Sequence, residues 1–318
     1  MKEAILKFLR NADGYLSGEE ISKSLKISRA GIWKHINELR RDGYEIVAIP
    51  HLGYSLASMP DKLFPAEIQN NLNTKILGKK IYHYEMVSSA MDVAFDLAIK
   101  GAQEGAVILA EGQQKGRGRM GRTWASPKGK GIYMSIILRP RLLPNETPKL
   151  TLLAGVAVSQ ALRKVTGLEL FIKWPNDILI KEKKVGGILT ELNAELDSVK
   201  FAVLGIGINV NTRKTFLPQK ATSLKEELGR NISRIELTKQ ILRELDNFYL
   251  LFERQGFSSI IELWRQISST LGKRIKVVSQ KNIIEGVAVD IDSQGALLIR
   301  KDSGFVTRVI SGDVVGIR

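Results

Sequence analysis

The chain has 318 residues, no cysteine and a formal net charge of +15. A chain of this length exceeds one small core, so we expect two or three domains. The absence of cysteine excludes disulfides, thiolate nucleophiles and cysteine-ligated zinc, and it fits a reducing cytoplasm. We expect no signal peptide, because charged residues interrupt the first ten positions, and no membrane span, because the longest apolar stretch, around residues 152–162, is short. The positive charge favours polyanionic partners.

Residues 1–60 are predicted to form a small unit of three helices and a hairpin. Ser17 and Glu20 have the spacing of a capping box ahead of the second helix, and Ser28 can cap the third helix. A hairpin at residues 44–56 completes the pattern of a winged helix-turn-helix. The core-facing residues expected in the third helix are Ile32, Ile36 and Leu39.

The outward face of the third helix is the candidate DNA-binding surface. This unit holds nine Lys and Arg residues against seven Asp and Glu residues, which is a small excess for a protein that binds phosphates. A three-helix module that binds protein therefore remains an alternative. The predicted DNA-contacting residues are Ser28, Arg29, Ala30, Trp33, Lys34 and Asn37.

Helical and strand patterns alternate from about residue 81 to residue 250, after a linker at residues 58–61. This alternation predicts an α/β or α+β domain around one mixed sheet. The expected helices are residues 88–100, 150–165 and 231–255. The expected strands are residues 106–110, 131–138, 170–174, 178–180, 185–191 and 201–210.

Short strands dominate the last fifty residues, with turn signals at 292–295 and 301–304. A small β-barrel is expected there. Its predicted strands are residues 273–278, 283–290, 296–299 and 306–309. The chain as a whole is predicted to be multidomain, with boundaries at 1–60, 61–270 and 271–318.

Residues 116–124 form the most informative segment, in which three arginines alternate with three glycines ahead of Trp124. Glycine lets the backbone bend sharply and approach a ligand closely. Each guanidinium is permanently charged and can hold a phosphate or carboxylate at two points. The segment therefore predicts a mobile loop that wraps an anion. It lacks the Gly-Lys-Ser/Thr ending of the usual phosphate loop.

Two further motifs carry polar candidates at strand ends. Pro175 predicts a turn from which Asn176 and Asp177 emerge, so the carboxylate can help to hold Mg²⁺ and the amide can bind a nucleotide. A plain turn is the alternative. Lys184 precedes a strand that begins with glycines, and such glycines often mark close approach by a ligand. A surface lysine is the alternative there.

Residues 205–211 alternate strictly between small or amide residues and branched apolar ones. One face of this strand holds Gly205, Gly207, Asn209 and Asn211, so it is stripped of bulk and suits a face lying against a ligand. Tight packing of a helix on the sheet is the alternative.

The three histidines of the chain stand in no metal-ligand spacing and beside no plausible nucleophile. The remaining candidates are cationic, polar or glycine. That set suits a reaction whose barrier falls through positioning and charge neutralisation, such as attack on a nucleoside triphosphate.

Taken together, these segments resemble the bifunctional biotin–protein ligase and biotin operon repressor family over the whole chain. We call residues 116–124 the arginine loop; its combination with Lys-Trp-Pro-Asn-Asp at residues 173–177 is highly specific. The resemblance implies a catalytic domain of the biotin/lipoate ligase type and a C-terminal SH3-like barrel. The segments that carry it are residues 28–36, 53–56, 113–124, 173–177, 184–189 and 205–209.

The activity implied by the resemblance has two steps. Biotin and MgATP form biotinyl-5′-adenylate with release of pyrophosphate, and a lysine amine of a biotin carboxyl carrier protein then attacks the acyl-adenylate. The substrates supply both the carboxylate and the amine, so the enzyme needs no nucleophile of its own. The family further implies operator DNA as a partner and a cytoplasmic homodimer, formed through the central domain on adenylate binding.

Site residues follow from the resemblance by position. Arg119 and Lys184 resemble the cations that contact the reacting carboxylate and α-phosphate, and they are the predicted catalytic residues. The implied biotin-binding residues are Ser89, Ala90, Met91, Gln113, Arg117, Gly118, Arg119, Lys184 and Gly187. The implied nucleotide-binding residues are Arg119, Arg122, Trp124, Asn176, Asp177, Lys184 and Asn209, with Asp177 as the implied Mg²⁺ ligand.

The chain departs from the family at Ala90 and Met91, where bifunctional repressors often read Thr-Asn after the serine. A hydroxyl that would bond biotin's ureido ring is therefore missing at Ala90. Two other functions stay open at this point. One is a DNA-binding regulator that only senses biotin or its adenylate, against which the paired cations argue. The other is a lipoate or octanoate ligase, against which the arginine loop and the N-terminal unit argue.

Overall fold

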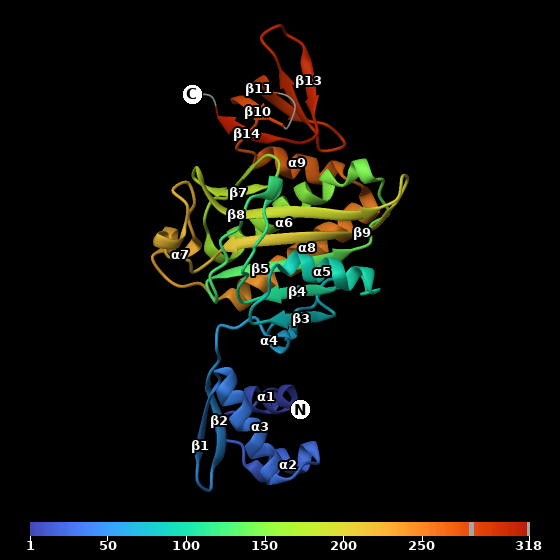
Figure 1. Ribbon diagram of the computed structural model, residues 1–318. Helices are drawn as coiled ribbons and strands as arrows, with labels where there is room; N and C mark the ends of the chain where they lie inside the picture. Colours follow the sequence, from blue (N-terminus) through green and yellow to red (C-terminus); the bar gives the residue numbers. More distant parts are fainter. Residues whose placement is uncertain (280–282, 317–318) are drawn as a thin grey trace. The chain divides into compact units, whose positions relative to one another are not determined.

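The computed structural model describes residues 1–279 and 283–316. The chain divides into two compact units, Met1–Lys62 and Leu63–Arg318, and each is described by itself (Figure 1). Within the described residues no helix combines the length and the apolar character needed to cross a membrane.

The unit Met1–Lys62 contains three helices and one antiparallel hairpin, as the sequence predicts. The capping box is present, because the Ser17 hydroxyl accepts from the Glu20 N–H and the Glu20 side chain accepts from the Ser17 N–H. Each such cap stabilises a helix by about 1 kcal/mol. The elements are α1 (Lys2–Arg10), α2 (Gly18–Leu25), α3 (Arg29–Asp42), β1 (Glu45–Ile49) and β2 (Gly53–Ser58).

The core of this unit is apolar and contains the three residues predicted to face inward, Ile32, Ile36 and Leu39. The hairpin is tied to the segment before α2, where Leu16 and Tyr54 exchange two backbone hydrogen bonds of 2.9 and 2.8 Å. A Cβ at Gly53 would lie 2.0 Å from the Leu16 carbonyl oxygen, so this close approach requires glycine.

The unit Leu63–Arg318 is built on a seven-stranded mixed sheet of order β3-β4-β5-β9-β8-β7-β6. Only β3 and β4 run parallel, and the other neighbouring pairs are antiparallel. The expected mixed sheet is therefore confirmed. The strands are β3 (Ile81–Tyr84), β4 (Val107–Ala110), β5 (Gly131–Leu138), β6 (Phe171–Lys173), β7 (Asp177–Ile180), β8 (Lys183–Ala194) and β9 (Val199–Asn209).

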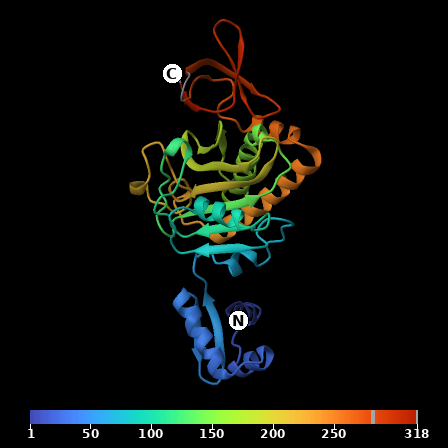
Figure 2. The same cartoon turned by 45° about the vertical axis from the view of Figure 1, so that its right-hand side comes forward.

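Helices cover both faces of this sheet (Figure 1, Figure 2). On one face α6 (Pro148–Thr166), α8 (Arg234–Gln255) and α9 (Ser258–Gln266) join the main core. On the other face α5 (Ala90–Ile99) packs on a smaller apolar cluster. The side chains of β9 alternate between the two clusters, which follows from the period of two in a strand. Two short helices, α4 (Pro65–Gln69) and α7 (Leu224–Leu228), flank the sheet.

The last part of the chain forms a five-stranded antiparallel sheet of order β13-β12-β11-β10-β14. Four strands were predicted, and β14 is an addition that a four-residue segment ending in glycine did not indicate. Residues 280–282 and 317–318 of the expected domain 271–318 lie outside the described residues. The strands are β10 (Arg274–Val278), β11 (Ile283–Ile291), β12 (Leu297–Arg300), β13 (Val306–Val309) and β14 (Asp313–Gly316).

Candidate active site

The floor of the site is a patch of glycines on β8 and β9. Gly187 and Gly207 lie opposite one another across the two strands. A Cβ on Gly207 would lie 2.6 Å from the Trp124 indole, and one on Gly205 would lie 2.4 Å from the Met91 sulfur. Any larger residue at these two positions would displace side chains that line the site, so the alternation read from the sequence has a steric cause.

Residues 112–124, the first part of the loop between β4 and β5, cross this floor as a narrow hairpin. The Trp124 N–H donates to the Gly116 carbonyl at 2.8 Å, and the Gly118 N–H donates to the Arg122 carbonyl at 2.7 Å. At the tip Met120 has a φ of +54°, an uncommon left-handed conformation for a residue with a side chain. The hairpin therefore carries its three arginines on a defined backbone.

A cavity of about 180 Å³ lies between the loop, the glycine floor and the turn before β7. It collects most of the residues predicted to bind ligand, although they come from distant parts of the chain. The predicted residues that line it are Ala90, Met91, Gln113, Arg117, Gly118, Arg119, Arg122, Trp124, Asn176, Asp177, Lys184 and Gly187.

Two predicted residues do not line this cavity. Ser89 is fully buried behind it, and its hydroxyl has no hydrogen-bond partner among the described residues. Asn209 is also buried, and its amide donates to the Thr222 carbonyl at 3.0 Å. Asn209 thus holds the segment after β9 in place.

Positive charge gathers at one end of the cavity around the Asp177 carboxylate. The Lys184 Nζ lies 2.5 Å from the Asp177 Oδ1 and 5.4 Å from the centre of the Trp124 ring. Burial lowers the pKa of Arg119, with Asp177 opposing this shift and Arg122 adding to it. Burial likewise lowers the pKa of Lys173, again opposed by Asp177. The cations that line the cavity outnumber its two carboxylates, Asp177 and Asp313, which favours an anionic ligand.

The three loop arginines differ in their partners. Arg117 forms ion pairs with Glu191 and with Asp92, the latter at 3.3 Å, and Arg122 pairs with Asp313. Within the described part of the chain Arg119 makes no ion pair. Arg119 is therefore the loop cation left available for a ligand.

The turn that presents Asn176 and Asp177 is held from several sides. The Asn176 amide donates to the Ile188 carbonyl at 2.7 Å, and the Ile188 N–H donates back to the Asn176 carbonyl at 3.0 Å. The Trp174 indole donates to the Gly295 carbonyl at 3.2 Å. These bonds fix the Asp177 carboxylate at the cavity wall.

Among the described residues, Asp177 is not part of a preformed metal-binding site. Residues 1–279 and 283–316 contain no group of three or more His, Asp or Glu side chains arranged to hold a metal ion. Mg²⁺ at nucleotide sites commonly takes one or two carboxylates and several phosphate oxygens, so a single carboxylate fits a Mg²⁺ ion that arrives on a triphosphate.

Comparison with known proteins agrees with this geometry. Residues 84–211 match the biotin/lipoate A/B protein ligase family, residues 2–55 match an HTH domain, and residues 270–315 match the biotin protein ligase C-terminal domain. The bifunctional ligase/repressor BirA of Bacillus subtilis is 39% identical over 317 residues, which cover 98% of this chain and 97% of that protein. The chain belongs to the biotin protein ligase family. Its predicted membership is thereby confirmed.

Other members of the biotin protein ligase family are also similar to this chain in sequence or in structure. The bifunctional ligase/repressor BirA of Escherichia coli is 31% identical over 312 residues, covering 98% of this chain and 95% of that protein. The solved structure of the biotin protein ligase from Aquifex aeolicus in complex with biotin and ATP has a TM-score of 0.65 at 31% identity, covering 76% of this chain and 99% of that chain.

Several cavity residues were given no role from the sequence. Lys173 ends β6 and begins the motif of residues 173–177. Its place in that motif was the signal that could have predicted its position at the cavity. Asp313 lies in the C-terminal strand β14 and reaches the cavity through the fold, and no sequence pattern pointed to it. The lining residues without a predicted role include Tyr133, Ser135, Lys173, Asp313 and Val314.

The candidate DNA-binding face is a separate feature on α3. Ser28 caps the helix by accepting from the Gly31 N–H at 3.1 Å. Trp33 is 61% exposed on this face. The exposed or half-buried residues of this face are Ser28, Arg29, Ala30, Trp33, Lys34 and Asn37. Arg29 is paired with Glu19, so its charge is partly offset.

Proposed function

We propose that this chain activates biotin with MgATP to biotinyl-5′-AMP and then transfers biotin to a lysine of a biotin carboxyl carrier protein. The observation that carries the proposal is the pairing of Arg119 and Lys184 at one cavity beside Asp177. Two cations at one cavity suit two anions that must be brought together, here the biotin carboxylate and the α-phosphate.

The chemistry needs no nucleophile from the protein. A biotin carboxylate oxygen attacks the α-phosphorus, and the bond to pyrophosphate breaks. A carrier lysine amine then attacks the acyl carbon, AMP leaves, and the amine loses a proton. Arg119 and Lys184 lower the barrier by neutralising charge and aligning the reactants, which are effects worth several kcal/mol in enclosed sites.

Biotin is proposed to lie over the glycine floor. The small residues Ala90, Gly118 and Gly187 leave room, and Met91 and Gln113 form the wall beside them. The Gln113 amide already accepts from the Ala90 N–H at 2.8 Å and donates to the Ser126 hydroxyl at 2.8 Å. Its part in biotin binding is therefore to shape the pocket as well as to contact the ligand. Ser89 is proposed to contribute to the biotin site from outside the cavity lining, since its buried hydroxyl has no partner among the described residues.

ATP is proposed to take the cationic end of the cavity. Arg122, Lys173 and Lys184 suit its phosphates, and Asp177 suits the Mg²⁺ that accompanies them. Trp124 is proposed to pack against the adenine, and its buried indole N–H has no partner among the described residues. Asn176 and Asn209 are proposed to act mainly by holding the turns around the nucleotide, since each amide donates to a backbone carbonyl.

A second role as a biotin-responsive repressor is favoured by the N-terminal unit. We propose three functional domains at residues 1–60, 61–270 and 271–318, the first of which binds a palindromic operator as a dimer. The dimer is proposed to form through the central domain in the cytoplasm. Residues 189–194 of β8 pair with β9 alone among the described strands, which leaves an edge that a second copy can use.

One experiment tests the enzymatic proposal. The protein is incubated with labelled biotin, MgATP and an acceptor carrier domain, and transfer of label to the acceptor is expected. Adenylate formation without transfer, or binding without adenylate formation, would favour a regulator that only senses biotin. Lipoate that outcompetes biotin in adenylate formation would favour a lipoate-type ligase. Equal affinity for operator and random DNA, with or without adenylate, would refute the repressor role.

A further inference from the structure

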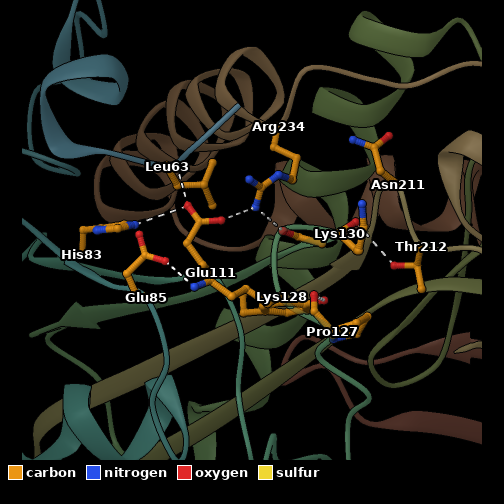
Figure 3. A network of polar contacts seen from close by, with 12 residues as sticks. Leu63, His83, Glu85, Glu111, Pro127, Lys128, Lys130, Asn211, Thr212 and Arg234 are labelled. Atoms are coloured by element: carbon orange, nitrogen blue, oxygen red, sulfur yellow. Dashed lines mark hydrogen bonds and ion pairs between the residues drawn. The ribbon is translucent and has the colours of Figure 1, made fainter. Parts of the chain in front are cut away.

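The arginine loop stands on a buried polar cluster that the proposed mechanism does not use. Glu111 directly follows β4 and is 1% exposed. Its carboxylate accepts from the Arg234 guanidinium at 2.8 Å and from the Leu63 N–H at 2.7 Å, and it lies 3.3 Å from the His83 Nε2 (Figure 3).

Arg234 reaches both ends of the loop from the start of α8. Its Nη1, besides donating to Glu111, donates to the Gly131 carbonyl at 3.3 Å. Glu111 precedes the loop of residues 112–130 and Gly131 follows it as the first residue of β5. One guanidinium, itself 2% exposed, therefore holds the two ends of the loop together.

Backbone hydrogen bonds connect this base with the tip of the loop. The Gly129 N–H donates to the Glu111 carbonyl at 2.9 Å, and the Gln113 N–H donates to the Ser126 carbonyl at 3.2 Å. The bonds at Trp124 and Gly118 continue the same ladder to the arginines. A second tie comes from the Lys128 ammonium, 2.6 Å from Glu85 (Figure 3). A shift at the base is thus carried along the hairpin to Arg119.

A role in folding alone does not explain a buried ion pair at this place. Removing two charges from water is costly, and apolar residues of similar volume often stabilise a protein as well or better. Burial by itself would raise the pKa of Glu111, but the hydrogen bonds from His83 and Leu63 and the charge of Arg234 outweigh it and lower that pKa to about 2. The carboxylate is therefore charged and bound by Arg234, Leu63 and His83, which favours a fixed orientation of the backbone at the base of the loop.

We propose that Arg234, acting through Glu111 and Gly131, is a positioning residue that sets the arginine loop over the cavity for the biotin-activating step. The inference rests on the proposed function. Arg234 is absent from the residues that line the cavity, so it acts on the ligands only through the loop.

The test compares Arg234→Met and Arg234→Lys with a matched control. Asp246 is 2% exposed and accepts from the N–H groups of Lys75, Ile76 and Leu77 at 2.6 to 2.8 Å, away from the cavity. Asp246→Asn therefore removes a buried polar anchor of similar kind. We expect Arg234→Met to raise the KM for biotin and for MgATP at least tenfold, Arg234→Lys to recover part of this, and Asp246→Asn to lower Tm with both KM values unchanged.

Trypsin cleavage after the loop arginines gives a readout that does not depend on catalysis. Without ligands, and at a temperature equally far below the Tm of each variant, we expect trypsin to cut Arg234→Met after the loop arginines faster than Asp246→Asn. Added biotin and ATP should protect Arg234→Met less than Asp246→Asn. KM values and cleavage rates within twofold of the unsubstituted protein would overturn the proposal, and so would equal changes in Asp246→Asn. If Arg234→Met does not fold, Glu111→Leu with Arg234→Met removes both charges and is read in the same way.

Failure of the proposed function is distinguishable from failure of this inference. If the unsubstituted protein makes no adenylate from biotin and ATP, the proposed function is wrong. The cleavage comparison in the empty proteins still decides whether Arg234 holds the loop.

Discussion

The Lys184 ammonium and the Asp177 carboxylate lie 2.5 Å apart at the cavity wall. They come from neighbouring strands, since β7 and β8 pair through Asp177 and Gly187, and the register of this pair shifts between Ile178 and Leu179. The pair keeps Lys184 turned toward the Trp124 ring, with its Nζ 5.4 Å from the ring centre. An incoming carboxylate or phosphate can therefore meet a lysine that is already oriented.

Replacing Lys184 tests its predicted catalytic role. We expect Lys184→Gln to lower kcat for adenylate formation by about 10²-fold, because loss of one preorganised charge contact costs about 3 kcal/mol in the transition state. The exposed neighbour Lys183→Gln is the control and should keep full activity. Equal kcat in both variants, measured by pyrophosphate release, would remove Lys184 from the mechanism.

Gly207 tests the glycine floor. A Cβ at this position would lie 2.6 Å from the Trp124 indole, so Gly207→Ala should displace the indole. We expect the KM for ATP to rise about tenfold or more, which corresponds to about 1.4 kcal/mol. Gly316→Ala meets no atom within 4 Å and serves as the control. Unchanged ATP binding in Gly207→Ala by calorimetry would contradict the placement of ATP beside Trp124.

The sequence predicted the elements that are rich in apolar residues over a sufficient length. The helix at 150–165 and the strand at 131–138 appear as α6 (Pro148–Thr166) and β5 (Gly131–Leu138), and most of their residues are apolar and buried. The capping box at Ser17 was readable because it depends on local spacing alone. Strand β14 was missed because four residues carry little periodic signal. Helix α9 was also missed, although its buried residues Ile260, Ile261 and Trp264 stand at helical spacing.

Only part of the candidate site could be predicted from the sequence, because some of its contacts join residues that are far apart in the chain. Arg119 and Asp177 were predicted as ligand contacts because each stands in a recognisable sequence motif, and both line the cavity. Glu111 and Arg234 are 123 positions apart, and their bond exists only once β4 and α8 pack in the folded unit. Asn209 has the position of a ligand contact in the sequence, but its amide is used by the Thr222 carbonyl. Such competition for a hydrogen bond cannot be seen from spacing.

Ser89 offers a test in which stability and binding should move in different directions. Its hydroxyl is buried and has no partner among the described residues, a condition that costs about 1 to 3 kcal/mol. We expect Ser89→Ala to keep or increase the unfolding free energy of the empty protein while weakening biotin binding about tenfold. The exposed Ser88→Ala is the control. A loss of stability without a change in biotin affinity, by calorimetry, would show that the hydroxyl serves the fold instead.

Lys34 tests the repressor role. It is exposed on α3, so Lys34→Ala should leave the unfolding free energy unchanged within about 0.5 kcal/mol. Loss of one phosphate contact should weaken operator binding and reduce the slope of affinity against salt by about 1. Lys7→Ala, on the exposed side of α1, is the control. Identical salt slopes for the two variants in a filter-binding or anisotropy titration would argue against α3 as the DNA-binding face.

Glu111 gives a prediction about pH. Its pKa of about 2 in the folded protein lies below the value of about 4.3 for an unfolded chain. A lowered carboxyl pKa stabilises the fold above the unfolded value, and this contribution is lost as the pH falls through about 4 toward 2. The stability advantage over Glu111→Gln should therefore shrink by on the order of 3 kcal/mol between pH 7 and pH 2.

Urea unfolding at a series of pH values from neutral to acidic measures this difference directly. Exposed Glu182→Gln provides the control and should track the unsubstituted protein at every pH. A difference between Glu111→Gln and the unsubstituted protein that stays constant over the whole range would mean that the Glu111 carboxylate gains nothing from His83, Leu63 and Arg234. In that case the charge on Glu111 would not be what holds the two ends of the loop.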